Sequence, residues 1–171
     1  SRLHVDEFVD GGGLQLATEL GAISGDHVGH SSETARQSAS DSGVMQTFLP
    51  GTPYILGHNL ETPLRQCIEN NWPFSLATDF NPNCRTLSMP FVGSLATHRL
   101  GLSPIEALVA VTRNPATTLL NSTPGQQVTG SIREGGPADL LILDSQYIDA
   151  WCQMPGDNPI YRTIKSGDIV N

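Results

Sequence analysis

The chain has 171 residues, of which 38% are hydrophobic and only 15% are charged, with 17 glycines and 12 prolines. This profile is typical of one loop-rich globular domain, or of part of a larger one, and it excludes a disordered or coiled-coil protein. The formal charge of −8 and the scattered basic residues argue against nucleic-acid binding, because a phosphate backbone needs lysine and arginine partners.

The first 78 residues predict strands that alternate with helices. The strands are expected over residues 2–8, 22–27, 44–49 and 74–78. Alternation of this kind indicates parallel strands joined by helical crossovers, and therefore an α/β fold. Four such units are too few to close a barrel, which normally needs eight strands.

Capping residues and turn formers mark the segments between these strands. The expected helices run from Leu14 to a stop at Gly21, from a cap at Ser31 or Ser32 to Gly43, and from a cap at Thr62 with Pro63 at the first helical position to about Asn71. The sequence Pro50-Gly51-Thr52-Pro53 predicts a turn.

The remaining residues predict helices first and then short strands. Helices are expected from Pro90 to Leu100, from a capping box at Ser103-Pro104-Ile105-Glu106 through Thr112, and from Asn114-Pro115 to near Leu120. From Gln126 onward, residues 130–132, 135–136, 138–144 and 161–165 predict short strands, with a hairpin at Ser166-Gly167.

Cysteines and hydrophobic runs bear on the cell compartment. Cys67, Cys84 and Cys152 lie far apart without C-x-x-C spacing, which argues against a disulfide framework and suits a reducing cytosol. No apolar run approaches the roughly 20 residues of a membrane span, so we expect a cytoplasmic protein with no membrane partner. The chain opens at Ser1 inside a predicted strand, and we interpret it as a fragment or a processed chain.

Polar side chains stand at the carboxyl ends of three predicted strands. His4 and Glu7 follow the first strand, His27 ends the second, and Asp79 ends the fourth. Ligands bind at this edge of parallel sheets and barrels, and imidazole with carboxylate suits Zn²⁺ or Fe²⁺. Taken alone, Asp79 is equally well explained by an Asx turn toward Asn81-Pro82.

Structural explanations also exist for the other histidines. A lone histidine is more often a hydrogen-bonded structural residue than a ligand, and we interpret His30 and His98 in that way. His58 is expected to face solvent in a loop. His4 and Asp79 would be only two metal ligands, whereas a catalytic zinc site usually has three protein ligands.

Several motifs of this chain resemble the imidazolonepropionase family of the amidohydrolase superfamily. They are His4-Val5-Asp6-Glu7-Phe8, Gly25-Asp26-His27, Leu49-Pro50-Gly51-Thr52-Pro53, Ala77-Thr78-Asp79-Phe80-Asn81-Pro82, Thr86-Leu87-Ser88-Met89-Pro90, Pro115-Ala116, and the tail from Gly130-Ser131-Ile132 through Ala138-Asp139-Leu140. The resemblance spans nearly the whole chain but only the C-terminal half of a typical member. It implies that residues 1–125 are strands 5 to 8 of a metal-dependent (β/α)8 TIM barrel, and that residues 126–171 are the C-terminal β segment of a small composite β-sandwich domain.

The same resemblance implies roles for individual residues. His4 and Asp79 match metal ligands for one divalent ion, Zn or Fe; Glu7, His27 and Asp79 match catalytic residues; Glu7, Asn81, Asn83 and Cys84 match substrate-binding positions. The chain departs from the family at Asn83 and Cys84, where many members carry glycine and serine. It also has no counterpart of the His-x-His pair on the first barrel strand.

The implied reaction is hydrolysis of the ring amide of 4-imidazolone-5-propanoate to N-formimidoyl-L-glutamate in L-histidine degradation. The expected partner is therefore this small molecule, and the family allows a homodimer. Because the His-x-His pair is missing, we expect the isolated chain to be inactive. Two alternatives stay open: another cyclic-amide hydrolase or deaminase of the superfamily, and an inactive fragment or partner-binding module.

Overall fold

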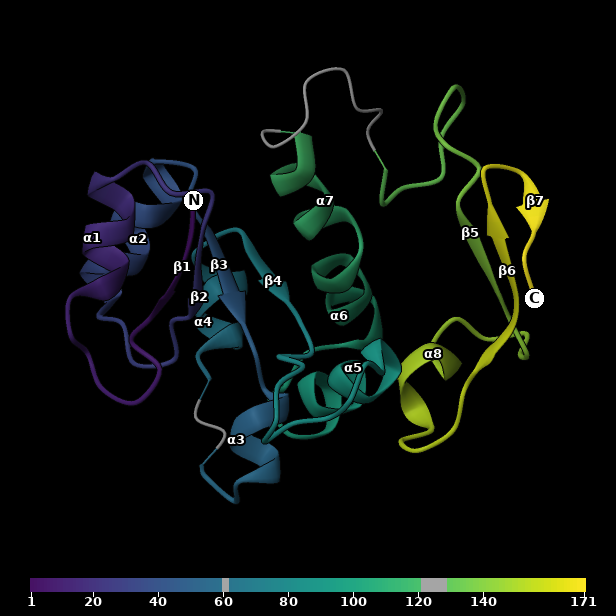
Figure 1. Cartoon of the computed structure of the whole chain (residues 1–171), viewed down its shortest axis with the longest axis horizontal. Helices are drawn as coiled ribbons and strands as arrows, with labels where there is room; N and C mark the ends of the chain where they lie inside the picture. The colour runs from purple at the N-terminus through teal and green to yellow at the C-terminus, as the bar shows by residue number, and fades with distance from the viewer. Residues whose placement is uncertain (60–61, 121–128) are drawn as a thin grey trace. The chain divides into compact units, whose positions relative to one another are not determined.

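The computed structural model describes residues 1–59, 62–120 and 129–171, and these form two compact units (Figure 1). Unit 1 covers residues 1–87 and unit 2 covers residues 88–171. Each unit has its own sheet and its own buried side chains. Gln126, where the β-rich tail was predicted to begin, lies outside the described residues.

Unit 1 contains a four-stranded parallel sheet whose strands lie side by side in chain order (Figure 1). The strands are β1 (Arg2–Val5), β2 (Ser24–His27), β3 (Met45–Phe48) and β4 (Phe74–Leu76). In the register of the sheet, Val5 lies opposite His27 and Phe48 lies opposite Leu76. The carboxyl ends of the strands therefore share one edge, and the predicted parallel α/β arrangement is confirmed.

Helices follow the strands of unit 1, as predicted. They are α1 (Gly13–Glu19), α2 (Glu33–Asp41), α3 (Gly51–Ile55) and α4 (Leu64–Glu69). Helix α1 packs against α2, β1 and β2. Ser32 caps α2 by accepting a 3.3 Å hydrogen bond from the Ala35 N–H. Gly21 and Gly43 have positive φ just beyond α1 and α2, which are the predicted stops.

Two predicted boundaries in unit 1 are wrong. Residues 50–53 lead into helix α3 instead of forming only a turn, and the Tyr54 N–H donates to the Pro50 carbonyl at 3.3 Å. Proline is compatible with the first turn of a helix, because N–H groups there have no partner within the helix. Helix α4 begins at Leu64 with Pro63 as its N-cap, so Thr62 is not the capping residue.

The hydrophobic core of unit 1 is centred on β3, which is buried along its whole length. The Phe48 ring meets the Phe74 ring edge-on, with centroids 6.1 Å apart and planes at 72°. Burial of such a side chain is worth roughly 1.5–3 kcal/mol. Gln46 is a fully buried polar residue on the same strand, and its amide hydrogen-bonds to α2.

Unit 2 begins with helices and ends with an antiparallel sheet. Its elements are α5 (Met89–His98), α6 (Pro104–Val111), α7 (Arg113–Leu120), β5 (Leu140–Leu143), α8 (Ala150–Gln153), β6 (Ile160–Lys165) and β7 (Asp168–Ile169). The capping box of α6 is confirmed, because the Ser103 hydroxyl accepts from the Glu106 N–H while the Glu106 carboxylate accepts from the Ser103 N–H. The hairpin at Ser166-Gly167 is also confirmed, with positive φ at both residues.

Other predictions for unit 2 are wrong. Residues 130–132 and 135–136 are not strands, and helix α8 was not predicted at all. Helix α8 depends on a tertiary contact: Trp151 packs so close to α5 that a Cβ on Gly93 would lie 2.3 Å from its ring. The Trp151 indole also donates to the Pro104 carbonyl at 3.0 Å. Because α8 has only four residues and is held by these contacts, no local sequence pattern predicts it.

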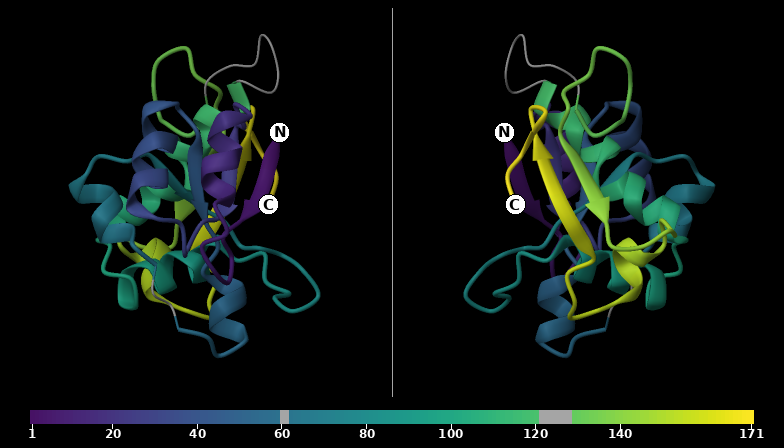
Figure 2. Two further views of the ribbon diagram at one scale, coloured as in Figure 1. Left: turned by 90° about the vertical axis from the view of Figure 1, so that its left-hand side faces the viewer. Right: turned by 90° about the vertical axis from the view of Figure 1, so that its right-hand side faces the viewer.

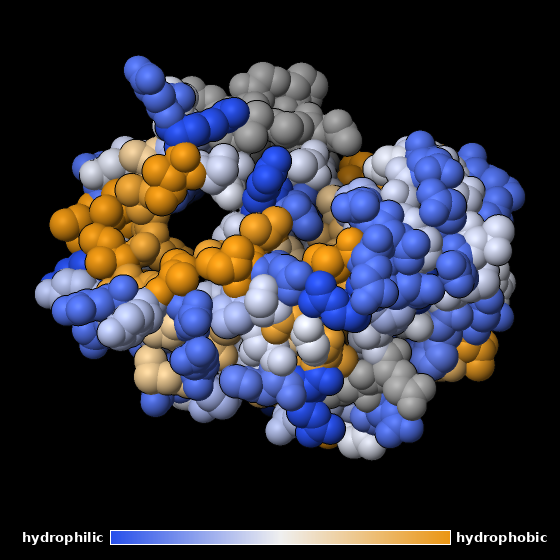
Figure 3. Space-filling view, turned by 180° about the vertical axis from the view of Figure 1, so that it is seen from behind, coloured by the Kyte–Doolittle hydropathy of each residue, from blue (hydrophilic) through white to orange (hydrophobic). Residues whose placement is uncertain are grey.

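Strands β5, β6 and β7 form one sheet, and Figure 2 (right) shows β5 and β6 side by side and antiparallel. Several large hydrophobic side chains on and beside this sheet are exposed: Leu141, Ile142, Tyr161, Ile169 and Val170. Figure 3 shows orange, hydrophobic residues gathered over this part of the chain. Within the described residues, the helices are too short or too polar to cross a membrane.

Candidate active site

The ends of β1 and β2 bring three of the predicted site residues together. The His4 Nδ1 and His27 Nε2 atoms lie 3.0 Å apart, with ring centroids 5.0 Å apart and planes tilted by 48°. One of these nitrogens must donate and the other accept, so at least one of the two rings is neutral in this pair. The Glu7 carboxylate lies 3.8 Å from the same His27 nitrogen. His27 is almost fully buried, whereas His4 is exposed.

Backbone strain is concentrated at the carboxyl ends of the strands. Six non-glycine residues in the described chain have positive φ, and four of them are Asp6, His27, Val28 and Asp79. The left-handed conformation costs about 1–2 kcal/mol for a residue with a Cβ, and most for a β-branched residue such as Val28. Strain of this kind persists only where surrounding contacts hold it, and it clusters at functional sites.

Asp6 holds the loop between β1 and α1 in place. Its carboxylate accepts hydrogen bonds from the N–H groups of Gly11, Gly13 and Leu14 at 3.1, 2.9 and 3.0 Å, and from the Ser31 hydroxyl at 2.6 Å. Burial alone would raise the pKa of Asp6, but the bonds from Ser31 and from the backbone outweigh it and keep the pKa below its ordinary value. Asp6 is therefore an anionic anchor in the segment that connects His4 to Glu7.

A second group of hydrogen bonds surrounds Asp79 beyond β4. The Thr52 hydroxyl donates to the Asp79 carboxylate and accepts a 2.9 Å hydrogen bond from the Asn81 side-chain amide. The same amide donates to the Asp79 carbonyl at 2.7 Å. Sequence reasoning did not assign Thr52 to the site, although it lies in the quoted Leu-Pro-Gly-Thr-Pro motif. Asp79 therefore has a fixed carboxylate orientation set by α3.

Asn83 and Cys84 complete this loop without pointing a reactive group outward. The Asn81 side-chain oxygen accepts from the Asn83 N–H at 2.8 Å and from the Cys84 N–H at 3.2 Å. The Cys84 side chain is fully buried, and its Sγ lies 3.7 Å from the Thr78 carbonyl oxygen. Asn83 is exposed. The predicted substrate contact of Cys84 would therefore need a movement of this loop, whereas Asn83 is accessible.

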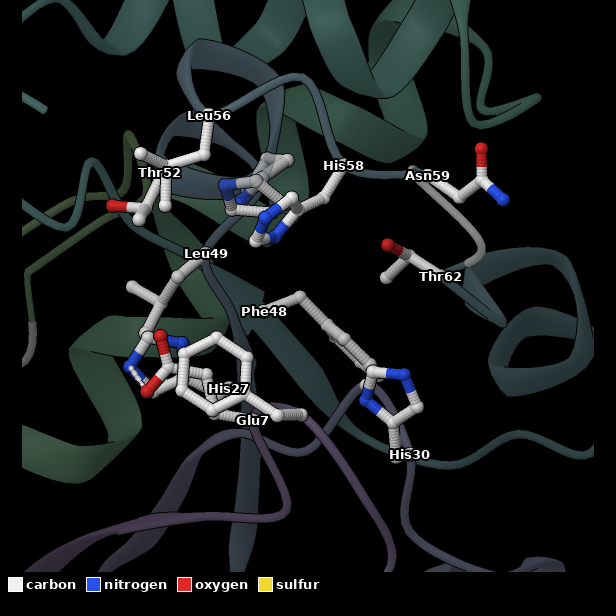
Figure 4. Close-up of a pocket in the computed structure, with 14 residues that line it drawn as sticks. Glu7, His27, His30, Phe48, Leu49, Thr52, Leu56, His58, Asn59 and Thr62 are labelled. Atoms are coloured by element: carbon white, nitrogen blue, oxygen red, sulfur yellow. Dashed lines mark ion pairs between the residues drawn. The ribbon is translucent and has the colours of Figure 1, made fainter. Parts of the chain in front are cut away.

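A cavity of about 240 Å³ lies beside these groups within unit 1 (Figure 4). Its lining residues include Glu7, His27, His30, Phe48, Thr52 and His58. Figure 4 shows Glu7 and His27 together, with His30 and His58 elsewhere along the wall. His30 and His58 are both exposed and carry ring nitrogens beside this space. Sequence reasoning assigned neither to the site, because nothing in the local pattern places them beside Glu7.

The donors at this edge are of the kind that binds a divalent transition metal. Imidazole and carboxylate groups suit Zn²⁺ and Fe²⁺. Within residues 1–59, 62–120 and 129–171, however, no three His, Cys, Asp or Glu side chains stand close enough together to hold an ion. The residues therefore fit part of a metal site, and two further features limit it: His4 is engaged with His27, and Asp79 with Thr52.

The parallel sheet thus carries histidine and carboxylate groups at its carboxyl edge. A family model described as "Amidohydrolase family" matches residues 21–170. The chain belongs to this family.

The curated relatives of this chain carry a more specific name than the family model does. The chain is 35% identical over 172 residues to the imidazolonepropionase of Halobacterium salinarum, covering 98% of this chain and 40% of that protein. It is 37% identical over 170 residues to the imidazolonepropionase of Geobacillus thermodenitrificans, covering 99% of this chain and 39% of that protein. The chain thus spans about two fifths of the length of the curated relatives that it matches.

Solved structures support the fold. Ochratoxinase from A. niger superposes with a TM-score of 0.76 at 22% identity, covering 98% of this chain and 40% of that chain. An adenosine deaminase from Xanthomonas campestris, solved with bound zinc, also gives 0.76 at 17% identity, covering 98% and 44%. These likenesses show that the chain shares the fold of the matching part of these two enzymes.

Proposed function

We propose that this chain is the C-terminal half of an imidazolonepropionase, which hydrolyses the ring amide of 4-imidazolone-5-propanoate to N-formimidoyl-L-glutamate in L-histidine degradation. The observation that carries the proposal is the group of His4, Glu7 and His27 at the sheet edge, in a chain about 35% identical to imidazolonepropionases. On this proposal the protein is cytoplasmic and its partner is the small-molecule substrate. The proposal allows a homodimer.

Asp79 is the proposed proton-transfer group. Its carboxylate accepts the proton of the attacking water and later returns it to the leaving ring nitrogen. The Thr52 hydroxyl holds this carboxylate in one orientation, and such alignment is a requirement for proton transfer. Proton transfers of this kind contribute about 10²–10⁴-fold to the rate.

His27 and Glu7 are the proposed groups on the substrate side. Both line the cavity, and His27 is positioned to stabilise the negative charge that develops on the carbonyl oxygen. Glu7 accepts a hydrogen bond from a ring nitrogen of the substrate. Asn81 and Asn83 contact the substrate from the loop after β4. Contact by Cys84 would go through its backbone after a movement of this loop, because its thiol is buried and its N–H and carbonyl are both hydrogen-bonded to Asn81.

One divalent metal ion, Zn or Fe, is the proposed cofactor, with His4 and Asp79 as the ligands from this chain. When bound, such an ion polarises a carbonyl and lowers the pKa of water from 15.7 toward about 7. The further ligands would come from the part of the relatives that this chain does not span. His4 would then exchange its contact with His27 for the ion.

For the architecture, we propose that residues 1–125 are strands 5 to 8 of a (β/α)8 barrel with their helices. Residues 126–171 would be the C-terminal β segment of a composite sandwich. The exposed hydrophobic side chains of Ile142 and Ile169, which the strand register places on the same face of the sheet, support this assignment, because a sandwich buries one face of each sheet.

The test supplies the N-terminal segment that this chain does not span. The chain is co-expressed with the N-terminal segment of the Halobacterium salinarum imidazolonepropionase that precedes the matched region, and co-purification shows whether the two assemble. We expect the assembled complex to hydrolyse 4-imidazolone-5-propanoate in preference to guanine, and Asp79→Asn to lower kcat by at least about 10²-fold. The matched control is Asp10→Asn, an exposed aspartate that should leave kcat unchanged. Full activity of Asp79→Asn, or an assembled complex without hydrolysis, would refute the proposal.

A further inference from the structure

Arg36 is a buried cation on the inner face of α2. Only 2% of its surface is exposed, so its guanidinium must find its hydrogen-bond partners inside the protein. It donates to three oxygens of unit 1: the Val28 carbonyl, the Gly29 carbonyl at 3.2 Å and the Gln46 side chain at 3.2 Å. Its carbon Cζ also lies 5.4 Å from the centre of the Phe48 ring.

The two carbonyls belong to the turn that directly follows His27. His27 and Val28 both have positive φ, 75° and 48°, so this turn holds two consecutive strained residues. The Val28 N–H donates to the Val5 carbonyl at 3.0 Å, and the His30 N–H donates to the Asp6 carbonyl at 3.2 Å. The N–H side of the turn is therefore held by Val5 at the end of β1 and by Asp6 after it. The carbonyl side is held by Arg36, together with the Ser31 N–H, which donates to the Val28 carbonyl at 3.3 Å.

Gln46 is the third acceptor of the Arg36 guanidinium. Its side-chain amide donates to the Arg36 carbonyl at 3.2 Å and accepts from the Arg36 guanidinium, which gives a two-way link between β3 and α2. Gln46 is fully buried, so both of its side-chain bonds are made inside the protein. The planar guanidinium can serve Gln46 and the two carbonyls at once because it has several donors in a fixed geometry.

We propose that Arg36 is a positioning residue for His27: its bonds to the Val28 and Gly29 carbonyls hold the strained turn that aims the His27 ring at His4 and Glu7. The importance of this aim for catalysis rests on the proposed function. The geometric claim does not, because it concerns only the turn and the two rings. Arg36 is outside the cavity lining and acts only through the turn and Phe48.

The wild-type chain gives the first test. In the ¹⁵N- and ¹³C-labelled chain of 171 residues, the guanidinium of Arg36 should give separate, slowly exchanging Nη–H signals, with a hydrogen-bond coupling to the Val28 carbonyl carbon. A single averaged Nη–H signal would overturn the proposal. This measurement needs no variant, so it decides the matter even where a substitution prevents folding.

The second test compares two substitutions. Arg36→Met keeps an unbranched apolar stem and removes all donors, whereas Gln46→Met leaves Arg36 its two carbonyls. We expect Arg36→Met to speed amide exchange of Val28 and His30 at least about tenfold and to abolish the NOE between the His4 and His27 rings. Amide exchange of Val92 in α5 should not change. Arg36→Lys, which can still donate to one carbonyl, should restore the NOE in part.

The outcomes distinguish a positioning role of Arg36 from a purely stabilising role. They also test Arg36 independently of the proposed function. A folded Arg36→Met chain that keeps the ring NOE and the slow exchange of Val28 would refute positioning. In the assembled complex, Arg36→Met should lower kcat with little change in KM, while Gln46→Met and the exposed control Arg99→Met should not. A complex without hydrolase activity would refute the proposed function, and the NMR results would still decide the role of Arg36.

Discussion

Replacement of Asp6 by asparagine tests how strongly the site loop depends on one buried carboxylate. In the native chain each carboxylate oxygen accepts two hydrogen bonds: Oδ1 from the N–H groups of Gly11 and Gly13, and Oδ2 from the Leu14 N–H and the Ser31 hydroxyl. Asparagine has one acceptor oxygen and one NH₂ group. With the NH₂ group in the Oδ2 position, the Ser31 hydroxyl can rotate and accept, but the Leu14 N–H loses its acceptor.

The expected cost follows from this loss. An unsatisfied buried N–H costs about 1–3 kcal/mol, and the remaining bonds become weaker because the acceptor is neutral, so we expect Asp6→Asn to lower the free energy of unfolding by roughly 2–4 kcal/mol at pH 7. The folded chain holds the pKa of Asp6 below its ordinary value. This contribution is therefore complete above the unfolded pKa of about 3.9 and is lost as the pH falls through the lower folded pKa.

Urea unfolding followed by tryptophan fluorescence and far-UV circular dichroism provides the measurement, at pH 7 and at pH 3. The control is Asp10→Asn in the same loop. Asp10 is exposed and accepts the Gly12 N–H at 3.1 Å, a bond that asparagine can keep. The control should therefore change stability by no more than about 0.5 kcal/mol. A difference below about 0.5 kcal/mol for Asp6→Asn at pH 7, or a difference that grows as the pH falls, would refute the reasoning.

Two further predictions concern packing around the site and its cysteines. Gly51→Ala should lower the free energy of unfolding by about 1–3 kcal/mol in urea titrations, because the added Cβ would lie 2.8 Å from the Thr78 carbonyl oxygen and 2.9 Å from the Cys84 sulfur; a neutral result would show that the loop before Asp79 can move. Burial raises the pKa of Cys67 to about 11, so this thiol should resist a thiol-specific disulfide reagent at pH 8 until urea is added, as followed by mass spectrometry. Rapid labelling of Cys67 in the folded chain would contradict its burial.

Elements with local signals could be predicted from the sequence. The capping box at Ser103 and Glu106 places two hydrogen-bonding side chains at a fixed spacing, and the structure has both bonds. Ser32 as the N-cap of α2 and Gly43 with positive φ beyond its end are likewise local signals that the structure confirms. The motif Pro50-Gly51 failed because its residues suit both a turn and the first turn of a helix, and only the packing of the whole chain selects between them.

From the sequence, only the location of the candidate site in the fold could be predicted, not the contacts within it. Strand–helix alternation places the carboxyl ends of parallel strands on one edge, so His4, His27 and Asp79 were expected there, and the structure has His4 beside His27. The bond between Thr52 and Asp79 joins residues 27 positions apart, and no local pattern reports it. Roles as metal ligands or catalytic groups remain predictions, since they depend on chemistry beyond these contacts.

The strained turns at the strand ends and the buried charges of Asp6 and Arg36 have a common structural cause. A turn directly after a parallel strand leaves N–H and C=O groups that the sheet does not pair, and each buried group needs a partner. Here the Asp6 carboxylate takes N–H groups after β1, and the Arg36 guanidinium takes C=O groups after β2. Burial lowers the pKa of Arg36, and the negative charge of Asp6 acts in the opposite direction. The two side chains of opposite charge therefore fix both turns from which Glu7 and His27 project, so the geometry of the site is set by residues that need not touch a substrate.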